Sequence, residues 1–233
     1  MVRDAGSRTR WPADRSRLDE SRSLYEKTRL PATECWLAQQ RPPELYPDAV
    51  TLVPGLAARD VLRAVRGRRR CFVKDSFLDL GLSRLGFDEL FRARWIFREP
   101  NAPVESGAAA WSVVDSEDGL EEWTGAADLV GIIRSELLAE PSVRVVALYG
   151  PDGLAGGGIA NRTGSVVGVS NVFTTTMAVP DAWAGIVHAL ATLFPSLPQV
   201  GYERGESLES ALAAGFSEIG RLRVWLRPAP ANG

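Results

Sequence analysis

The chain has 233 residues, of which 45% are hydrophobic and 24% charged, and its formal net charge is −2. This composition is ordinary for a globular protein and excludes a disordered, collagenous or coiled-coil chain. The length allows one large domain or two small ones. No apolar run approaches the ~20 residues of a membrane span, and the first ten residues lead into no apolar segment of the kind a secretory signal needs. We therefore expect a cytoplasmic protein with no membrane partner.

Charge is divided unevenly along the chain. Residues 1–100 hold 20 Lys and Arg against 14 Asp and Glu, whereas residues 101–233 hold 7 against 15. The densest basic cluster is Arg66, Arg68, Arg69 and Arg70. A solvated turn explains this cluster best, and anion binding is the alternative.

Cysteine and histidine are scarce. Cys35 and Cys71 have no Cys or His partner at metal-ligand spacing, and His188 is the single histidine. We predict no metal site, and a Ser-His-Asp relay has little support. Cys71 is better interpreted as a buried apolar residue than as a nucleophile, and His188 as a packed helix residue than as a base.

The N-terminal part is predicted to contain a polar tail or wrapping segment over residues 1–43 and a small unit over residues 44–99. Apolar content rises around Trp36 and Leu37 enough for a helix or wrapping segment. A linker rich in Pro, Asn and Gly over residues 99–107 is the best domain boundary. The expected elements are a strand at 50–53, a helix at 56–65, a strand at 71–73, a short helix at 78–85 and a strand at 90–97.

Residues 107–233 are predicted to form a second, larger unit with the order β-α-α-β-β-β-α-β-α-β. Ser116 precedes acidic residues in the manner of a helix cap, and Asp181 is expected to cap a later helix. The expected strands are 109–114, 143–149, 154–160, 165–173, 199–203 and 218–226, and the expected helices are 116–123, 126–138, 181–194 and 207–214.

A glycine-rich stretch at residues 153–158 follows a predicted strand, as the loop of a dinucleotide site would. It leads into another strand rather than into a helix, which is the context that motif requires. We interpret it as a hairpin whose glycines permit close approach or a bulge.

An internal repeat links the two parts. With an offset of 129 residues, residues 86–98 align with residues 215–227, and six of the thirteen positions are identical. The same offset places predicted helix on helix and strand on strand, so the N-terminal unit is predicted to be a partial copy of the C-terminal one.

The element order from residue 109 to residue 226, the segment Val-Val-Gly-Val-Ser-Asn-Val-Phe at 166–173 before a helix, and the helix–Gly215-Phe216–strand ending resemble the GNAT superfamily of N-acyltransferases. The resemblance covers about half of the chain in full. It implies an α/β (α+β) fold with a mixed, mostly antiparallel sheet flanked by helices, here with the N-terminal half-repeat added.

In that family an acyl-CoA lies between the fourth and fifth strands, which correspond here to residues 165–173 and 199–203. The resemblance implies that the backbone of Val169, Asn171 and Phe173 pairs with the pantetheine arm. Amides entering the next helix would hold the pyrophosphate, because an exposed helix N-terminus attracts phosphate. The hydroxyls of Thr174, Thr175 and Thr176 could act as further donors.

The sequence departs from the family pattern in two places. The segment 174–181 lacks the glycines of the usual phosphate loop, and Asp181 would repel a pyrophosphate. The tyrosine that many members use as the general acid is replaced by Ala211.

An amine acceptor needs a base, and Glu203 at the end of the fifth strand, with Tyr202 beside it, is the best-placed candidate. The alternative is a rim carboxylate that pairs with Arg204 or Arg162. Asn171 is a polar residue inside an otherwise apolar strand. Burial would oblige it to find hydrogen-bond partners, of which a ligand is one possibility. Trp183 and Trp225 are expected in the core or an interface.

Three functions remain open at this stage. The first is transfer of an acyl group from acetyl-CoA or another acyl-CoA to an amine of a small molecule or protein, without a metal, by a monomer or homodimer. The second is a catalytically inactive GNAT-fold module that senses a ligand or binds a protein. The third is anion or nucleic-acid binding by the basic N-terminal half, which has the least support because no aromatic residues accompany its arginines.

Overall fold

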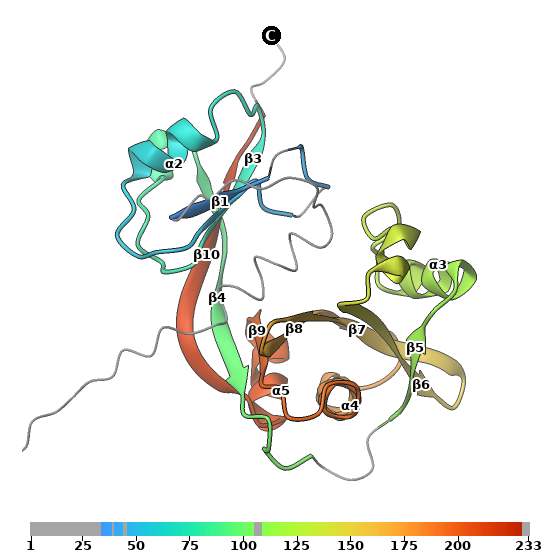
Figure 1. The fold of residues 1–233 in the computed structure, drawn as a ribbon. Coiled ribbons are helices and arrows are strands. Elements are labelled where there is room, and N and C mark those ends of the chain that lie inside the picture. Colours follow the sequence, from blue (N-terminus) through green and yellow to red (C-terminus); the bar gives the residue numbers. More distant parts are fainter. Residues whose placement is uncertain (1–33, 39, 44–45, 105–108, 230–233) are drawn as a thin grey trace, which may run out of the picture.

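The computed structural model describes residues 34–38, 40–43, 46–104 and 109–229, and its centre is one ten-stranded sheet (Figure 1). The strand order is β1-β2-β3-β10-β4-β9-β8-β7-β6-β5. The pairs β2–β3 and β8–β9 are parallel, and the others are antiparallel. The predicted mixed, mostly antiparallel sheet is confirmed. Within the described residues, no helix has the length and hydropathy to span a membrane.

The N-terminal elements form one end of the sheet. They are β1 (Cys35–Leu37), β2 (Ala49–Thr51), α2 (Ala58–Ala64), β3 (Cys71–Asp75), the 3-10 turn η1 (Ser83–Leu85) and β4 (Asp88–Arg98). Trp36 and Leu37, expected in a helix or wrapping segment, belong to strand β1. Most of the predicted tail over residues 1–43 lies outside the described residues.

The C-terminal elements follow the predicted order closely. They are β5 (Ala110–Val114), α3 (Glu117–Ala126), the 3-10 turn η2 (Ser135–Ala139), β6 (Val143–Gly150), β7 (Gly153–Thr163), β8 (Val166–Thr174), α4 (Val179–Leu193), β9 (Gln199–Glu203), α5 (Gly205–Ala213) and β10 (Ser217–Arg227). Ser116 caps α3 as predicted, since its side chain accepts a hydrogen bond from the amide of Gly119.

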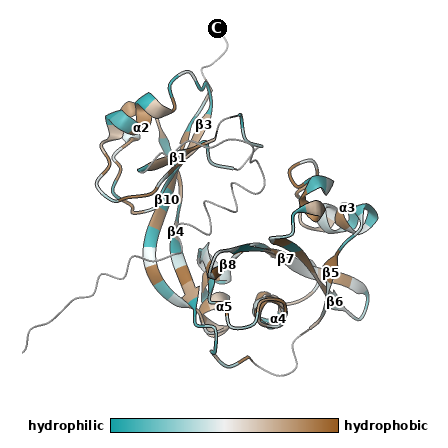
Figure 2. Ribbon diagram, in the orientation of Figure 1, coloured by the Kyte–Doolittle hydropathy of each residue, from teal (hydrophilic) through white to brown (hydrophobic). Residues whose placement is uncertain are grey.

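Helices cover both faces of the sheet because its central strands carry apolar residues on both sides. On β6, Val146 and Leu148 pack with α4, whereas Val145 and Ala147 pack with Trp123 of α3. The exposed residues of α3 are mostly acidic, and hydrophilic residues are coloured teal along this helix in Figure 2. Trp183 and Trp225 are buried, which confirms their expected place in the core.

Three local predictions are wrong. The helix expected at 126–138 does not form: α3 ends at Ala126, and positive φ angles of 55° at Asp128 and 74° at Gly131 interrupt the chain before η2. The helix expected at 78–85 is only the turn η1, because Leu78 has a φ of 58°. The carboxylate of Asp75 instead accepts the amides of Asp79 and Leu80.

The third error concerns the start of α4. The N-cap is Ala178, and Asp181 lies inside the first turn with an exposed side chain. Pro180 explains this earlier start, since proline is pre-organised for the first helical turn, where its missing N–H has no intrahelical partner.

The two segments that the repeat aligns contain the strands β4 and β10. The bounds of these strands differ by 129 residues at both ends, and the two strands pair antiparallel in the middle of the sheet. Each follows a glycine with positive φ, Gly86 at 79° and Gly215 at 92°, and a buried phenylalanine, Phe87 and Phe216. These equivalences fit the repeat. The half-repeat and the domain boundary themselves stay predictions, because one sheet includes strands from both parts.

Chain order does not follow strand order at the centre. Strand β4, from the N-terminal part, lies between β9 and β10 of the C-terminal part, and β10 in turn lies between β3 and β4 (Figure 1). Each part therefore contributes one strand that lies between two strands of the other part.

Candidate functional site

The strands β8 and β9 separate soon after they meet. Their parallel pairing consists of Val167 opposite Gln199 and Gly168 opposite Val200. Beyond this point β8 continues to Thr174 along β7, whereas β9 continues to Glu203 along β4. The two strands therefore part toward their carboxyl ends, in the region where the resemblance to GNAT proteins implies an acyl-CoA.

A bulge in β8 accompanies this separation. The register with β7 shifts between Gly157, opposite Phe173, and Ile159, opposite Ser170, and Asn171 within the bulge has a φ of 51°. Asparagine tolerates this left-handed conformation better than most residues. A bulge bends its strand and increases the local twist, which turns the end of β8 away from β9.

The side chains at the end of β8 pack on both sides of the sheet. Phe173 meets the Trp123 ring edge-on, with 5.0 Å between ring centroids, and Val172 packs against the core beneath α4. Asn171 is half-buried. The expected pairing of Val169, Asn171 and Phe173 with a pantetheine arm is a role of their backbone and stays a prediction.

The glycine run in β7 serves this packing. The indole nitrogen of Trp123 donates to the carbonyl of Val146 at 2.9 Å, and a Cβ on Gly157 would overlap that nitrogen. The interpretation of the run as part of a hairpin is thus confirmed, and of the two roles considered for its glycines Gly157 shows the close approach.

The segment between β8 and α4 offers few donors to a phosphate. The Thr175 amide donates to the carbonyl of Ala155 at 2.9 Å, and its hydroxyl donates to that of Leu154 at 3.2 Å. Pro180 removes one amide from the first turn of α4, and Asp181 adds a negative charge there. Of the three threonines considered as phosphate donors, Thr176 is exposed and Thr174 half-buried.

Glu203 and Tyr202 lie on opposite faces of β9, because neighbouring residues of a strand alternate. Tyr202 packs edge-on against Trp95 at 5.6 Å, and the Lys74 Nζ lies 4.5 Å from the Tyr202 ring centre. Glu203 is half-buried and stands opposite Arg94 of β4. The structure does not bring these two predicted catalytic side chains together.

A pocket of about 260 Å³ adjoins Glu203 on the β4 side of β9. Its charged lining was missed by the sequence analysis, although two of its arginines, Arg92 and Arg221, are aligned by the repeat. The lining residues are Leu78, Arg92, Ala93, Arg94, Glu203, Arg204, Gly205, Leu208, Arg221 and Leu222.

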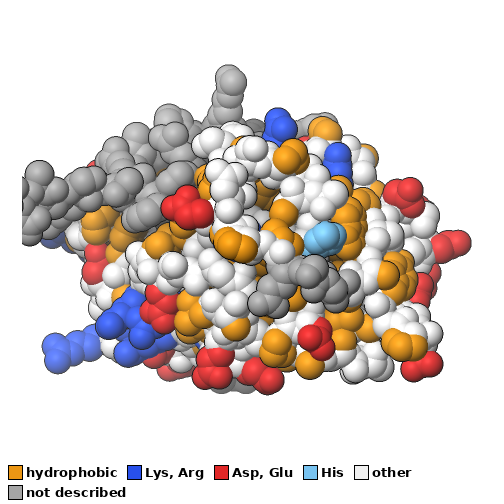
Figure 3. Space-filling model, turned by 90° about the horizontal axis from the view of Figure 1, so that it is seen from below, with side chains coloured by type: hydrophobic (Ala, Val, Ile, Leu, Met, Phe, Trp, Pro, Cys, Tyr) orange, Lys and Arg blue, Asp and Glu red, His pale blue; other side chains and the backbone are white. Residues whose placement is uncertain are grey.

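Other residues considered in the sequence lie partly or wholly in the protein interior. Cys71 is fully buried, as predicted, and burial raises the pKa of its thiol to about 11. His188 is half-buried on α4 and reaches the molecular surface (Figure 3). Ala211, which stands where many GNAT members have tyrosine, is fully buried. No group of three or more His, Cys, Asp or Glu side chains suited to a metal ion occurs among the described residues.

The basic cluster at residues 66–70 is partly structural. Arg68 forms an ion pair with Asp48 and also donates to the carbonyl of Ala38. Asp48 in turn accepts the amide of Phe72, whose ring lies 5.1 Å from the Arg70 guanidinium. Arg68 therefore joins N-terminal segments to one another, and Arg70 contacts the aromatic ring of its near neighbour Phe72.

No protein-family model matches the sequence, and no curated protein matches it. Solved structures do match. A conserved protein of unknown function from Staphylococcus epidermidis ATCC 12228 has a TM-score of 0.63 at 9% identity, covering 88% of this chain and 95% of its own.

Two further matches carry a family description. A protein from Novosphingobium aromaticivorans DSM 12444, assigned to the GNAT acetyltransferases, has a TM-score of 0.58 at 12% identity and covers 95% of this chain and 96% of its own. A GCN5-related N-acetyltransferase from Kribbella flavida has a TM-score of 0.54 at 13% identity, covering 77% and 80%. The chain thus has the fold of the GNAT N-acetyltransferases.

Proposed function

We propose that the protein is an acyl-CoA-dependent N-acyltransferase, with acetyl-CoA as the first donor to test. The observation that carries this proposal is the separation of β8 from β9 after two paired positions, next to the bulge at Asn171. Strands that part in this way can admit an extended ligand between them, and a ligand's amide groups can pair with a strand as an added strand would. The GNAT fold makes the pantetheine arm of an acyl-CoA the natural candidate.

The chemistry requires a group that accepts a proton from the acceptor. The amine nitrogen attacks the thioester carbon, the C–N bond forms, and the C–S bond breaks. An ammonium acceptor loses one proton to a base and a second to the departing thiolate, which leaves as the free thiol. We assign the base to Glu203, directly or through one water, because it ends β9 beside the separation and lines the pocket. Tyr202 packs on the opposite face and is not assigned a part.

A specific observation supports the second candidate, a GNAT-fold module that binds a ligand without catalysis. Thr175 uses its amide and hydroxyl within the protein, and the first turn of α4 contains Pro180 and Asp181. These features weaken the expected pyrophosphate site, because a helix N-terminus binds anions through available N–H groups and its positive end.

Isothermal titration with acetyl-CoA, followed by measurement of thiol release with a panel of amines, separates the two. Heat of binding together with amine-dependent thiol release supports the enzyme. Binding without release from any amine supports the ligand-binding module. The absence of heat at millimolar acetyl-CoA contradicts both the enzyme and an acyl-CoA sensor.

A further inference from the structure

Arginines from three elements meet on one face of the sheet beside Glu203. The register places Glu203 of β9 opposite Arg94 of β4, and Arg94 opposite Arg221 of β10. Residues directly opposite in an antiparallel pair share a face. Arg92 precedes Arg94 by two residues and therefore lies on the same face of β4, and Arg204 directly precedes α5. All five side chains belong to the lining of the 260 Å³ pocket.

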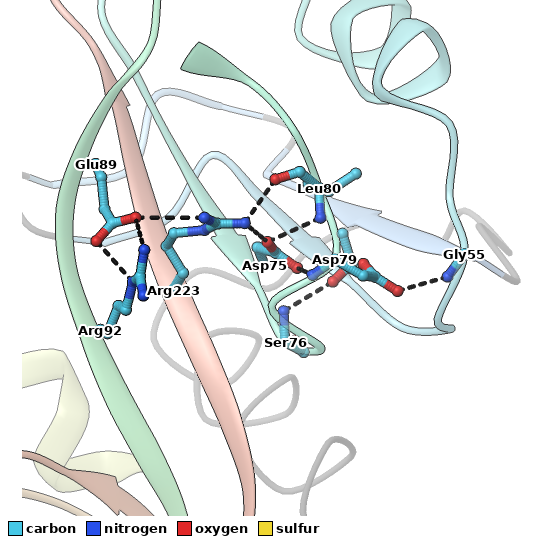
Figure 4. Close-up of polar contacts among 9 residues, drawn as sticks. Gly55, Asp75, Ser76, Asp79, Leu80, Glu89, Arg92 and Arg223 are labelled. Atoms are coloured by element: carbon cyan, nitrogen blue, oxygen red, sulfur yellow. Dashed lines mark hydrogen bonds and ion pairs between the residues drawn. The ribbon is translucent and has the colours of Figure 1, made fainter.

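Arg94 has an equivalent in the other half of the repeat, and this equivalent is an arginine with a structural role. Arg223, which the 129-residue offset aligns with Arg94, donates to Asp75 at 3.2 Å and to the carbonyl of Leu80 at 2.7 Å. It also contacts Glu89 at 3.3 Å (Figure 4), and its side chain is only 14% exposed. This guanidinium is held on several sides by the protein.

Arg94 is bound more loosely than Arg223. Its ion pair with Glu218 is the counterpart of the pair between Arg223 and Glu89, but it measures 3.5 Å, and the Arg94 side chain is 36% exposed. Asp75, the register partner of Arg223, is fully buried, whereas Glu203, the register partner of Arg94, is half-buried and borders the pocket. The aligned arginines of β4 and β10 thus differ: the site around Arg223 is closed by the protein, and the site around Arg94 is open.

The pocket also has a surplus of positive charge. Arg92 is neutralised by a two-point contact with Glu89, at 2.8 and 2.9 Å, and Arg94 by Glu218. With Glu203 included, three carboxylates face the four guanidinium groups, which leaves one positive charge. The Arg204 guanidinium lies over the Phe91 ring, 4.7 Å from its centre, and this cation–π contact does not neutralise its charge.

We propose that this pocket binds an acceptor that carries both an amine and a carboxylate, as an amino acid does. The inference rests on the proposed N-acyltransferase function and names its acceptor class. The carboxylate lies toward Arg204 and Arg221, and the amine lies toward Glu203, which is the base. Arginine forks match carboxylate geometry, and a single carboxylate balances the surplus charge. The small volume suits a ligand of amino-acid size.

The test compares each of the twenty L-amino acids with its amide, which keeps the amine and loses the carboxylate. Binding is measured by isothermal titration without acyl-CoA, and turnover by thiol release with acetyl-CoA. We expect at least one amino acid to bind at least 10-fold more tightly than its amide. We expect Arg221→Gln and Arg204→Gln each to weaken that binding about 10-fold, the effect of losing one charge-assisted hydrogen bond. Arg59→Gln, an exposed residue of α2 outside the pocket, is the matched control.

The outcomes separate this inference from the proposed function. Carboxylate-dependent binding without thiol release supports the pocket assignment and contradicts the enzyme. Thiol release from amides and amino acids alike supports the enzyme and overturns the acceptor class. Failure of all twenty amino acids to bind, or binding of phosphoethanolamine alone, overturns the carboxylate assignment. Melting temperatures equal to that of the unchanged protein show that the glutamine variants are folded.

Discussion

Arg223 and Asp75 are 148 residues apart in the chain and form an ion pair of 3.2 Å across the neighbouring strands β10 and β3. Asp75 is fully buried, and its carboxylate also accepts the amides of Asp79 and Leu80. Arg223 in addition lies 4.2 Å from the centre of the Trp225 ring. This pair therefore joins the C-terminal strand to the turn that follows β3.

Replacement of Asp75 should destabilise the protein strongly. Asp75→Ala leaves the mostly buried Arg223 guanidinium without its buried carboxylate partner and two amides without their acceptor, so we expect a loss of about 3 kcal/mol in the free energy of unfolding. Urea unfolding measures it. Asp60→Ala, which removes the exposed Asp60–Arg63 pair on α2, is the control and should change stability by less than about 0.5 kcal/mol. Equal effects of the two variants would contradict a structural role for Asp75.

Gly157 should tolerate no side chain. In Gly157→Ala the new Cβ overlaps the indole nitrogen of Trp123 and the carbonyl of Val146, so Trp123 must move and its hydrogen bond is lost. Overpacking of this kind costs about 1–3 kcal/mol, and thermal unfolding should show it. Gly125→Ala in α3, where a Cβ meets nothing within 4 Å, should instead stabilise by about 0.5–1 kcal/mol. An unchanged melting temperature in Gly157→Ala would rule out this close approach.

The conformation of Asn171 should control binding of acetyl-CoA. Asn171→Gly preserves the φ of 51° at no steric cost, whereas a β-branched valine strains it by about 1–3 kcal/mol. We expect Asn171→Val to flatten the bulge and lower acetyl-CoA affinity in isothermal titration. Asn171→Gly should bind as the unchanged protein does. Loss of binding in the glycine variant with retention in the valine variant would show that the asparagine side chain, and not the bulge, matters.

Both cysteines should be unreactive in the folded protein. Burial raises the pKa of the Cys35 and Cys71 thiols from 9.0 to about 11 each, so about one thousandth of either is thiolate at pH 8. A disulfide reagent at pH 8 should modify the native protein much more slowly than the urea-unfolded one. Fast labelling of either thiol in the native protein would argue against this burial.

The same shifts predict a pH dependence of stability. The folded state retains thiol protons that the unfolded state releases above about pH 9, so the cysteine contribution is complete below pH 9 and is lost as the pH rises toward 11. Urea unfolding at pH 8 and pH 10 tests this sign. In a protein with both cysteines replaced by alanine, the decrease between the two pH values should be smaller.

Removal of the Glu203 carboxylate should slow acyl transfer. For Glu203→Gln we expect a decrease of about 100-fold in kcat/KM at pH 7. The difference should shrink as the pH rises, because a free amine needs no base to accept its first proton. Glu209→Gln, an exposed position on α5, is the matched control. A pH-independent loss would indicate a positioning role for Glu203 rather than that of a base.

Local pattern in the sequence was enough for much of the fold. Apolar runs bounded by turn residues predicted β9 with its observed bounds and most other strands to within a few residues, and Ser116 marked the start of α3. The 129-residue repeat predicted that β4 and β10 correspond. The resemblance to GNAT enzymes, which rests on element order, agrees with the solved structures.

Contacts between distant residues decided the rest. No local signal shows that β4 inserts between β9 and β10, because pairing between strands over 100 residues apart depends on the whole sheet. The turn after Asp75 replaces a helix because Arg223 and the Asp75 carboxylate hold it. The pocket likewise depends on contacts between residues that are distant in the chain. Its arginines are spread over three elements, and only the antiparallel register aligns Arg94 with Glu203 and Arg221 on one face. The sequence by itself therefore determined most of the elements and predicted that β4 and β10 correspond. The tertiary structure decided which charged side chains meet, since charge pairing depends on distance in space and not along the chain.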